Sequence, residues 1–117
     1  MPTSTSAKNL RHFNQLFISN KFQKFDYGLG NWQHYGQSTP PEYPLQNITH
    51  PALYIIYSDN DYFVPVTGIQ TLETLLKTAK EFYQVSDPLS NHMDVLTGKD
   101  VAVEVNIKVL SILETYN

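Results

Sequence analysis

The sequence of 117 residues contains no cysteine and little charge, and each shortage excludes a class of protein. Without cysteine, a chain has no disulfide bridges, no thiolate metal sites and no cysteine nucleophile. Charged residues make up 16% of the chain and its net charge is −3, so it lacks the basic composition of nucleic-acid-binding proteins. No apolar run approaches the roughly 20 residues of a membrane span. A small globular protein without a nucleic-acid partner is therefore expected.

The first twenty residues also lack an apolar stretch of roughly 7–15 residues, which a secretory signal requires. If Met1 is a true start, this predicts a chain that stays inside the cell, and the prediction fails if the chain is a piece of a longer one. The four histidines do not have the spacing of metal ligands, so we expect no metal and no cofactor. They are His12, His34, His50 and His92.

The first 50 residues are polar and aromatic, and they contain one helical pattern. Apolar residues recur on one helical face between positions 7 and 19, and Ser4 or Ser6 is placed to cap that helix. Residues 26–44 contain three glycines and three prolines, so we expect an irregular segment there.

Residues 51–117 carry the regular apolar patterns. The unbroken run ALYIIY at positions 52–57 predicts a fully buried parallel strand. Residues 68–80 have the spacing of an amphipathic helix, and residues 81–86 predict a second strand. Residues 101–116 fit either an alternating strand or a helix, and their length favours the helix.

A strand–helix–strand unit implies a parallel strand pair, and this places the chain in the α/β class. Parallel sheets have more than two strands and are covered on both faces. The sheet predicted from this sequence is therefore incomplete, as in one part of a larger fold. We expect two regions, residues 1–50 and residues 51–117.

Two loops follow the predicted strands and carry polar side chains. Asp59 and Asp61 follow the first strand, and His92 follows the second. Asp followed by His on successive parallel strands is the chain order of the last two triad members in α/β-hydrolases. In such a triad the carboxylate fixes the tautomer of the imidazole and stabilises the imidazolium. The alternative is that the carboxylates are turn or helix-cap residues and the histidine is merely solvated.

Several short motifs occur in order from about Thr5 onward, among them FQKFDYGLG, PPEY and NHMD. Together they resemble the C-terminal third of the gastric and lysosomal acid lipases, and the arthropod members look closest. The resemblance implies the C-terminal part of an α/β-hydrolase fold, with its last two parallel strands and flanking helices. Residues 1–50 would be the end of the cap region with a long loop, and residues 51–117 the strand–helix–strand–helix part of the core.

The resemblance implies a role for each polar residue of the two loops. Asp61 matches the catalytic acid, which orients the histidine, and His92 matches the general base and acid. Asp59 is the second choice for the acid, and Asp94 matches a residue that orders the histidine loop. The chain departs from the family at two positions, where Ser58 replaces a glycine and Val95 replaces a phenylalanine.

The family hydrolyses triacylglycerols and cholesteryl esters with a serine nucleophile, but this sequence contains no G-x-S-x-G motif. A lipase-like segment that holds the acid and histidine without the serine is therefore expected to be inactive alone. In the complete enzyme its partners would be the lipid ester and the missing N-terminal portion. The alternative is a stand-alone regulatory protein, derived from a truncated lipase, that binds a partner at its open sheet edge.

Residues 47–49 form an N-glycosylation sequon, so Asn47 is a candidate glycan site. Such a site matters only in a secreted or lysosomal protein. The resemblance implies one of these two locations for the complete family member.

Overall fold

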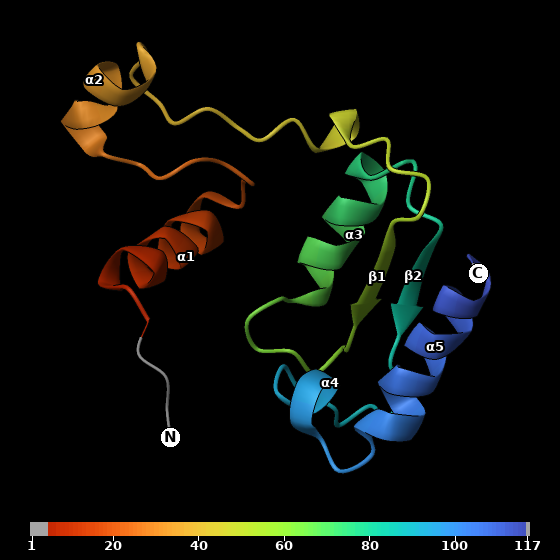
Figure 1. The fold of residues 1–117 in the computed structure, drawn as a ribbon. Helices are drawn as coiled ribbons and strands as arrows, with labels where there is room; N and C mark the ends of the chain where they lie inside the picture. Colours follow the sequence, from red (N-terminus) through yellow and green to blue (C-terminus); the bar gives the residue numbers. More distant parts are fainter. Residues whose placement is uncertain (1–4, 117) are drawn as a thin grey trace. The chain divides into compact units, whose positions relative to one another are not determined.

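The computed structural model describes residues 5–116, and the chain forms two compact units that meet between Pro44 and Leu45 (Figure 1). The boundary expected after residue 50 falls inside the second unit. The interpretation of the units as cap and core stays a prediction. No helix within residues 5–116 has the length and apolarity needed to cross a membrane.

The first unit begins with helix α1, Ala7–Ser19, which has the predicted bounds. The hydroxyl of Ser6 caps it by accepting a hydrogen bond of 3.2 Å from the amide of Lys8. Asn20 ends the helix in the left-handed conformation, with φ at 51°. The alternative cap, Ser4, lies outside the described residues.

Polar side chains of α1 contact the rest of the first unit. His12 Nε2 lies 2.8 Å from the carbonyl oxygen of Gln23. Gln15 exchanges two hydrogen bonds with the backbone of Asp26, at 2.8 and 2.9 Å. The apolar side chains of Leu10 and Phe17 on the same helix remain exposed.

The expectation that residues 26–44 are irregular is wrong in part. The 3₁₀ helix η1, Gly28–Gly30, leads directly into the short helix α2, Asn31–Tyr35. Two glycines with positive φ bound this helical segment, because Gly28 has φ at 62° and Gly36 has φ at 69°. The glycines that suggested an irregular segment thus start and end a helical one.

A buried asparagine holds this segment together. Asn31 Oδ1 accepts a hydrogen bond of 2.9 Å from the amide of Tyr27. Asn31 Nδ2 donates to Asp26 Oδ1 at 2.7 Å and to the carbonyl of Ser38 at 2.9 Å. All three bonds link residues close in sequence, so a polar network organises this part of the chain.

The second unit contains the strand–helix–strand pattern that the sequence predicts. Strand β1, Tyr54–Tyr57, is followed by helix α3, Val66–Leu75, and by strand β2, Glu81–Gln84. The strands are parallel, with Tyr54 opposite Glu81 and Tyr57 opposite Gln84. Figure 1 shows the strand pair between α3 and α5.

The last helical region confirms the helix interpretation over the strand. It consists of a π-helical segment η3, Ala102–Asn106, and helix α5, Ile107–Glu114. A short helix that the sequence did not predict, α4, Asp94–Thr97, precedes it. Helix α3 begins and ends earlier than expected. It ends at Leu75 because the backbone of Leu76, with φ at −91° and ψ at 62°, is not helical.

The prediction that the first strand is fully buried is wrong, because every residue of β1 is half-exposed. In the described part of the chain, β1 has only β2 as a neighbour, so its other edge is not covered by a strand. The buried apolar residues of the second unit lie mainly on the elements around the strands. They are Leu45, Ile69, Leu76, Val85 and Val105.

We expect Asn31→Ala to destabilise the first unit by about 2 kcal/mol, because it leaves buried hydrogen-bonding groups without partners. Trp32 is the only tryptophan of the chain, so its fluorescence during urea unfolding reports on this unit. Asn14→Ala on the exposed surface of α1 is the control and should change the unfolding free energy little. Equal stability of the two variants would contradict the role of Asn31.

Candidate functional site

Asp61 lies in the loop after β1, and the backbone of its own loop fixes its side chain. Its Oδ1 atom accepts hydrogen bonds from the amides of Phe63, at 2.7 Å, and Val64, at 3.0 Å. Aspartate forms such local turns readily because its short side chain reaches the amides that follow it. Asp61 is therefore held with its second oxygen, Oδ2, available to another residue.

His92 lies in the loop after β2, between two residues that bond to each other. Asp94 Oδ2 accepts a hydrogen bond of 3.0 Å from the amide of Asn91, and the amide of Asp94 donates to the carbonyl of Asn91 at 3.0 Å. Asn91 Oδ1 in turn accepts a bond of 2.9 Å from the amide of Met93. Asp94 thus orders the loop, as expected, and α4 begins at this point.

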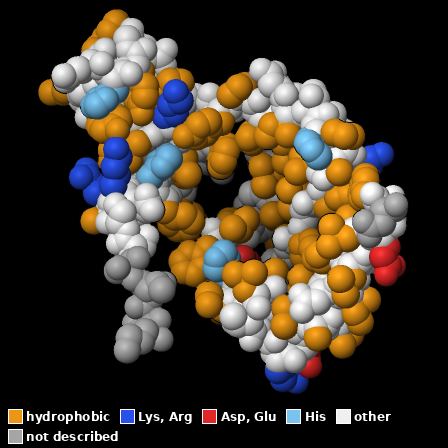
Figure 2. Space-filling view, viewed as in Figure 1, with side chains coloured by type: hydrophobic (Ala, Val, Ile, Leu, Met, Phe, Trp, Pro, Cys, Tyr) orange, Lys and Arg blue, Asp and Glu red, His pale blue; other side chains and the backbone are white. Residues whose placement is uncertain are grey.

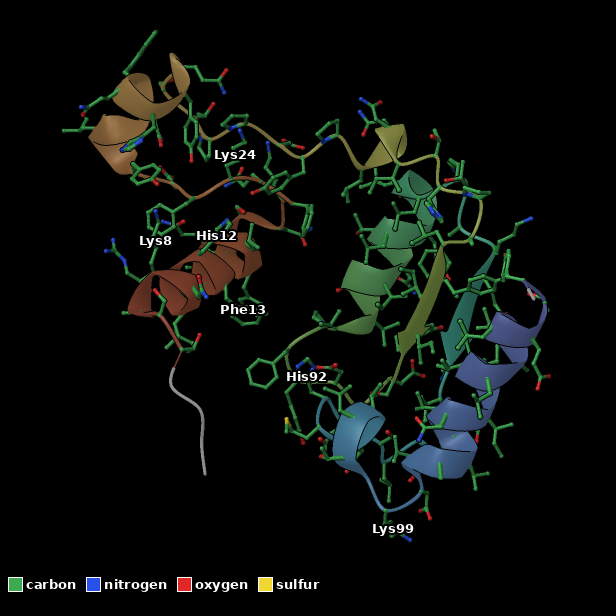
Figure 3. The ribbon with its side chains drawn as sticks, viewed as in Figure 1. Lys8, His12, Phe13, Lys24, His92 and Lys99 are labelled. Carbon is green, nitrogen blue, oxygen red and sulfur yellow. The ribbon has the colours of Figure 1, made fainter. Side chains whose placement is uncertain are left out.

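The two loops bring Asp61 and His92 into contact. His92 Nδ1 lies 2.8 Å from Asp61 Oδ2, across 31 positions of sequence. The parallel pairing explains this, because the carboxyl ends of both strands lie at the same edge of the sheet (Figures 1 and 3). The Asp61 side chain is 10% exposed and the His92 side chain 46%, so the histidine remains open to a reactant. The ring of Phe63 packs edge-on against His92, with 5.0 Å between ring centres.

The electrostatics of the site keep Asp61 ionised. Burial is the largest single influence on this carboxyl and favours its neutral form. The hydrogen bond from His92, the amides of Phe63 and Val64, and the attraction of the imidazolium favour the ionised form. Together they outweigh burial, so the pKa of Asp61 is lowered from its ordinary value of 3.8. An ionised carboxylate can stabilise the positive charge of an imidazolium, whereas a neutral carboxyl group cannot do so to the same extent.

The other polar residues after β1 do not join this pair. Asp59, the second choice for the acid, accepts a hydrogen bond of 2.6 Å from Gln84 Nε2. Ser58 is 1% exposed, and its hydroxyl has no hydrogen-bond partner among the described residues. A serine nucleophile needs contact with its base and access to substrate, so Ser58 does not have the placement of one.

An apolar hollow of about 330 Å³ lies beside the pair, and sequence reasoning did not find it. Side chains of β1, α3 and α4 line it together with Asp61 and His92. The only signal in the sequence was the apolar run of the first strand, which predicted burial instead. The other lining residues are Ile55, Ile56, Tyr57, Val64, Ile69, Leu72, Val95 and Leu96.

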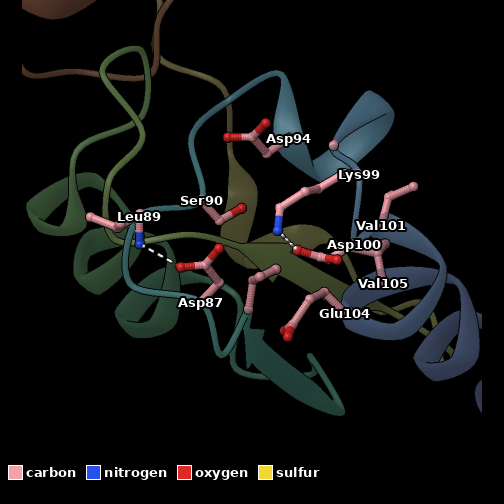
Figure 4. Close-up of a pocket in the computed structure, with 11 residues that line it drawn as sticks. Asp87, Leu89, Ser90, Asp94, Lys99, Asp100, Val101, Glu104 and Val105 are labelled. Carbon is pink, nitrogen blue, oxygen red and sulfur yellow. Dashed lines mark hydrogen bonds and ion pairs between the residues drawn. The ribbon is translucent and has the colours of Figure 1, made fainter.

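A second hollow, of about 320 Å³, lies between the loop after β2 and the start of the C-terminal helical region (Figure 4). Its acidic side chains are occupied by local bonds. Asp87 accepts from the amide of Leu89 at 2.9 Å, and Asp100 pairs with Lys99 at 3.1 Å. Glu104 accepts from the amide of Ser86 at 3.0 Å and also from its hydroxyl. Asp87 and Glu104 thus hold the loop after β2 in place, so we do not regard this hollow as a reactive site.

The remaining histidines lie elsewhere. His34 stacks on Tyr27 with 3.7 Å between ring centres, and His50 Nδ1 accepts a hydrogen bond of 3.1 Å from the amide of Ala52. Residues 5–116 contain no group of three side chains that could hold a metal ion. Asn47 is exposed and lies at the end of η2, a 3₁₀ turn over Leu45–Asn47.

The relation between Asp61 and His92 resembles one that is found in a known protein class. A carboxylate and an imidazole in contact, on loops at the carboxyl ends of neighbouring parallel strands, have the order and spatial relation of the acid and base in α/β-hydrolases. The strand pair with helices on its two sides is compatible with that fold.

Comparison with known proteins narrows this class to one family, although no family model matches the chain. Lipase 3 of Drosophila melanogaster is 33% identical over 116 residues, and gastric triacylglycerol lipase of Bos taurus is 33% identical over 114. Lysosomal acid lipase/cholesteryl ester hydrolase of Homo sapiens is 30% identical over 117 residues. The chain is thus homologous to the gastric and lysosomal acid lipases, as its motifs indicated.

The homology covers nearly all of this chain but a small part of each relative. It includes 98% of the chain for the Drosophila and human proteins and 96% for the bovine one. The same alignments include 28–29% of the relatives' own lengths. The chain thus spans less than a third of the length of the curated relatives that it matches.

We expect His92→Ala to raise the pKa of Asp61, because it removes a hydrogen bond and a positive charge that favour the carboxylate. A titration of the Asp61 carboxyl carbon by NMR measures this directly. An unchanged or lower pKa in the variant would show that the contact between the two side chains does not form in solution.

The same shift predicts how stability depends on pH. Because the pKa of Asp61 is lower in the folded chain, its contribution to stability is complete above 3.8 and is lost as the pH falls through the lowered value. In urea unfolding, Asp61→Asn should therefore lose less stability than the native chain on acidification through this range. Asp59→Asn, which leaves the contact with His92 intact, is the control.

Proposed function

We propose that this chain is a C-terminal segment of an acid-lipase-like ester hydrolase, in which Asp61 and His92 are the acid and base of a Ser–Asp–His triad. The observation that carries the proposal is the 2.8 Å contact between His92 Nδ1 and Asp61 Oδ2. The homology to acid lipases supports it, because the same two residues match the motifs of that family. The comparisons do not favour a stand-alone regulatory protein.

The contact determines how the histidine works in this mechanism. Asp61 accepts a hydrogen bond from Nδ1–H and so holds the tautomer in which the lone pair of Nε2 is free to act as a base. Nε2 takes the proton of a serine hydroxyl while the serine oxygen attacks the ester carbonyl. The imidazolium then gives this proton to the leaving alcohol, and Asp61 stabilises its charge meanwhile. Water then attacks the ester between the serine and the acyl group while Nε2 takes a proton from the water. The imidazolium returns this proton to the serine oxygen, and the carboxylic acid product is released.

The nucleophile of this mechanism comes from outside the 117 residues. The sequence has no G-x-S-x-G motif, and no serine of the described residues hydrogen bonds to His92. The relatives are more than three times as long as their alignment with this chain, so the longer polypeptide has room for the rest of the triad. A positioned serine and an oxyanion site are the two parts that these residues would need.

The substrate we propose is a lipid ester, a triacylglycerol or a cholesteryl ester. Two relatives are named for these substrates, the bovine gastric triacylglycerol lipase and the human cholesteryl ester hydrolase. The hollow beside His92 is lined mainly by aliphatic side chains, which suits an acyl chain better than a polar group.

We propose that the complete protein is secreted or lysosomal and carries a glycan at Asn47. The side chain of this residue is exposed at the end of η2, as a glycan acceptor must be. Two relatives carry the word gastric or lysosomal in their names. Loss of mass from the native protein on treatment with an N-glycosidase would support the glycan, and an unchanged mass would contradict it.

Alone, residues 1–117 should not hydrolyse esters above the level of a His92→Ala variant. The reason is that a base without a nucleophile has no group to activate. The measurement is turnover of p-nitrophenyl acetate, a water-soluble ester, by the purified chain. Turnover that His92→Ala abolishes would show that these residues contain a nucleophile of their own.

In a chimera, this chain should restore catalysis when it replaces the matching segment of Lipase 3 of Drosophila melanogaster, which would supply the serine. His92→Ala should then lower kcat for the same soluble ester by about 10⁶-fold, and Asp61→Asn by about 10⁴-fold. Asp59→Asn is the matched control and should stay within about twofold of the parent chimera.

Two outcomes of this experiment would contradict the assignment. One is an active chimera that keeps its kcat after His92→Ala. The other is a larger loss from Asp59→Asn than from Asp61→Asn, which would make Asp59 the acid. An immunoblot of the native protein adds an independent test, because the proposal predicts a polypeptide about three times heavier than the 13.4 kDa of this chain.

A further inference from the structure

Phe63 contacts both members of the acid–histidine pair, each through a different part of the residue. Its amide donates a hydrogen bond of 2.7 Å to Asp61 Oδ1. Its ring packs edge-on against the imidazole of His92, with 5.0 Å between the ring centres and 62° between the ring planes. Because Asp61 Oδ2 lies 2.8 Å from His92 Nδ1, the three residues form a closed cycle of contacts. The ring of Phe63 has no role in the chemistry proposed above.

The hydrogen bond to Asp61 fixes one atom of the imidazole but not the plane of the ring. Histidine has two side-chain torsions, and the second has a broad energy minimum. Small combined rotations tilt the ring and move Nε2 while Nδ1 stays within hydrogen-bonding distance of Asp61 Oδ2. Nε2 is the atom that must reach a hydroxyl, so its direction decides whether a proton can be transferred. A second contact on the ring is therefore needed to hold Nε2 in place.

Phe63 is the only aromatic ring within residues 5–116 that contacts the imidazole of His92. The His92 side chain is 46% exposed and lines the apolar hollow, so part of its surface has no neighbour in the described chain. The bonds between Asn91 and Asp94 hold the backbone of the loop but do not reach the ring. Figures 2 and 3 share one view, in which hydrophobic side chains border His92. The contact with Phe63 is thus the candidate for the second restraint.

The backbone on both sides of Phe63 is fixed, so its ring has a defined starting point. Before it, Asp61 Oδ1 holds the amides of Phe63 and Val64 in a tight turn. After it, Val64 precedes a proline, which restricts its backbone to extended conformations. Pro65 then caps α3, and its carbonyl accepts a hydrogen bond of 2.8 Å from the amide of Gly68. A ring that leaves the chain between a turn and a helix start can act as a restraint on its neighbour.

We infer that Phe63 is a positioning residue, whose ring holds the plane of the His92 imidazole so that Nε2 points toward the nucleophile of the complete enzyme. Edge-to-face contacts suit this task, because they attract the two rings in a tilted geometry and occupy no hydrogen-bonding site of the imidazole. The value of the restraint for catalysis rests on the proposed function, since the direction of Nε2 matters only where a hydroxyl loses its proton. The restraint itself is a property of these residues and is measured without catalysis.

The first test measures the motion of the His92 ring in the chain of 117 residues by NMR relaxation of its labelled carbons. Phe63→Ala removes the ring but keeps the amide that bonds to Asp61, so the order parameter of the imidazole should fall by about 0.2. Phe63→Tyr keeps an aromatic ring and should restore the native value. Tyr62→Ala is the matched control, because it removes the adjacent exposed aromatic residue and should leave the motion unchanged.

The second test uses the chimera with Lipase 3 of Drosophila melanogaster and the soluble ester p-nitrophenyl acetate. Phe63→Ala should lower kcat by about 10–10²-fold and change KM by less than about twofold, because a small displacement of a reacting atom costs rate rather than binding. Phe63→Tyr should restore most of kcat, and Phe63→Leu, which keeps apolar volume without an aromatic ring, should lie between the two. Tyr62→Ala should stay within about twofold of the parent. Circular dichroism of each variant checks that the fold is kept.

Three results would overturn the positioning role of Phe63. The first is an equal order parameter of the His92 ring in the native and Phe63→Ala chains, and the second is a Phe63→Tyr chain that does not recover it. The third is a chimera in which Phe63→Ala raises KM and leaves kcat unchanged, which would make Phe63 a substrate contact. A chimera that keeps its kcat after His92→Ala would instead contradict the proposed function, while the NMR comparison still decides whether Phe63 restrains the ring.

Discussion

The parallel pairing of β1 with β2 is the constraint on which the candidate site depends. The register sets Tyr57 opposite Gln84, and the amide of Val85 continues the ladder with a 2.8 Å bond to the carbonyl of Tyr57. Both strands therefore end at the same edge of the sheet, and Asp61 and His92 in the loops that follow them meet there. An antiparallel pair would place the two loops at opposite ends, and Asp61 and His92 would not touch.

Each of the two units is stabilised internally by a different kind of interaction. The first depends on hydrogen bonds around Asn31, Gln15 and Tyr35, and it leaves several large apolar side chains in solvent. The second has a small apolar core around Ile69 and Val105. A buried polar network makes one arrangement strongly preferred but removes little apolar surface from water.

The second unit has features of a sheet with further neighbours. Strand β1 is half-exposed although its sequence is typical of a buried parallel strand. Just after it, the buried hydroxyl of Ser58 has no partner within the described residues. The relatives are more than three times as long as the part that this chain matches. Our proposal of a segment from a longer hydrolase accounts for these observations together.

The sequence by itself determined the elements that depend on local patterns. The cap at Ser6 and the apolar period predicted α1 with its correct bounds, and the two short apolar runs predicted both strands. It also selected Asp61 and His92, through their order after the strands and through family motifs. The roles of these two residues stay predictions, while the contact between them was decided by strand pairing.

Only the tertiary structure decided the burial of Asn31, the exposure of β1 and the hollow beside His92. Composition made residues 26–44 look irregular, but hydrogen bonds among Asp26, Asn31 and Ser38 allow two helical turns there. The exposure of a strand depends on how many neighbours it has, and the shape of a hollow depends on three elements packed together. Neither quantity is a property of a local stretch of sequence, so no local pattern encodes it.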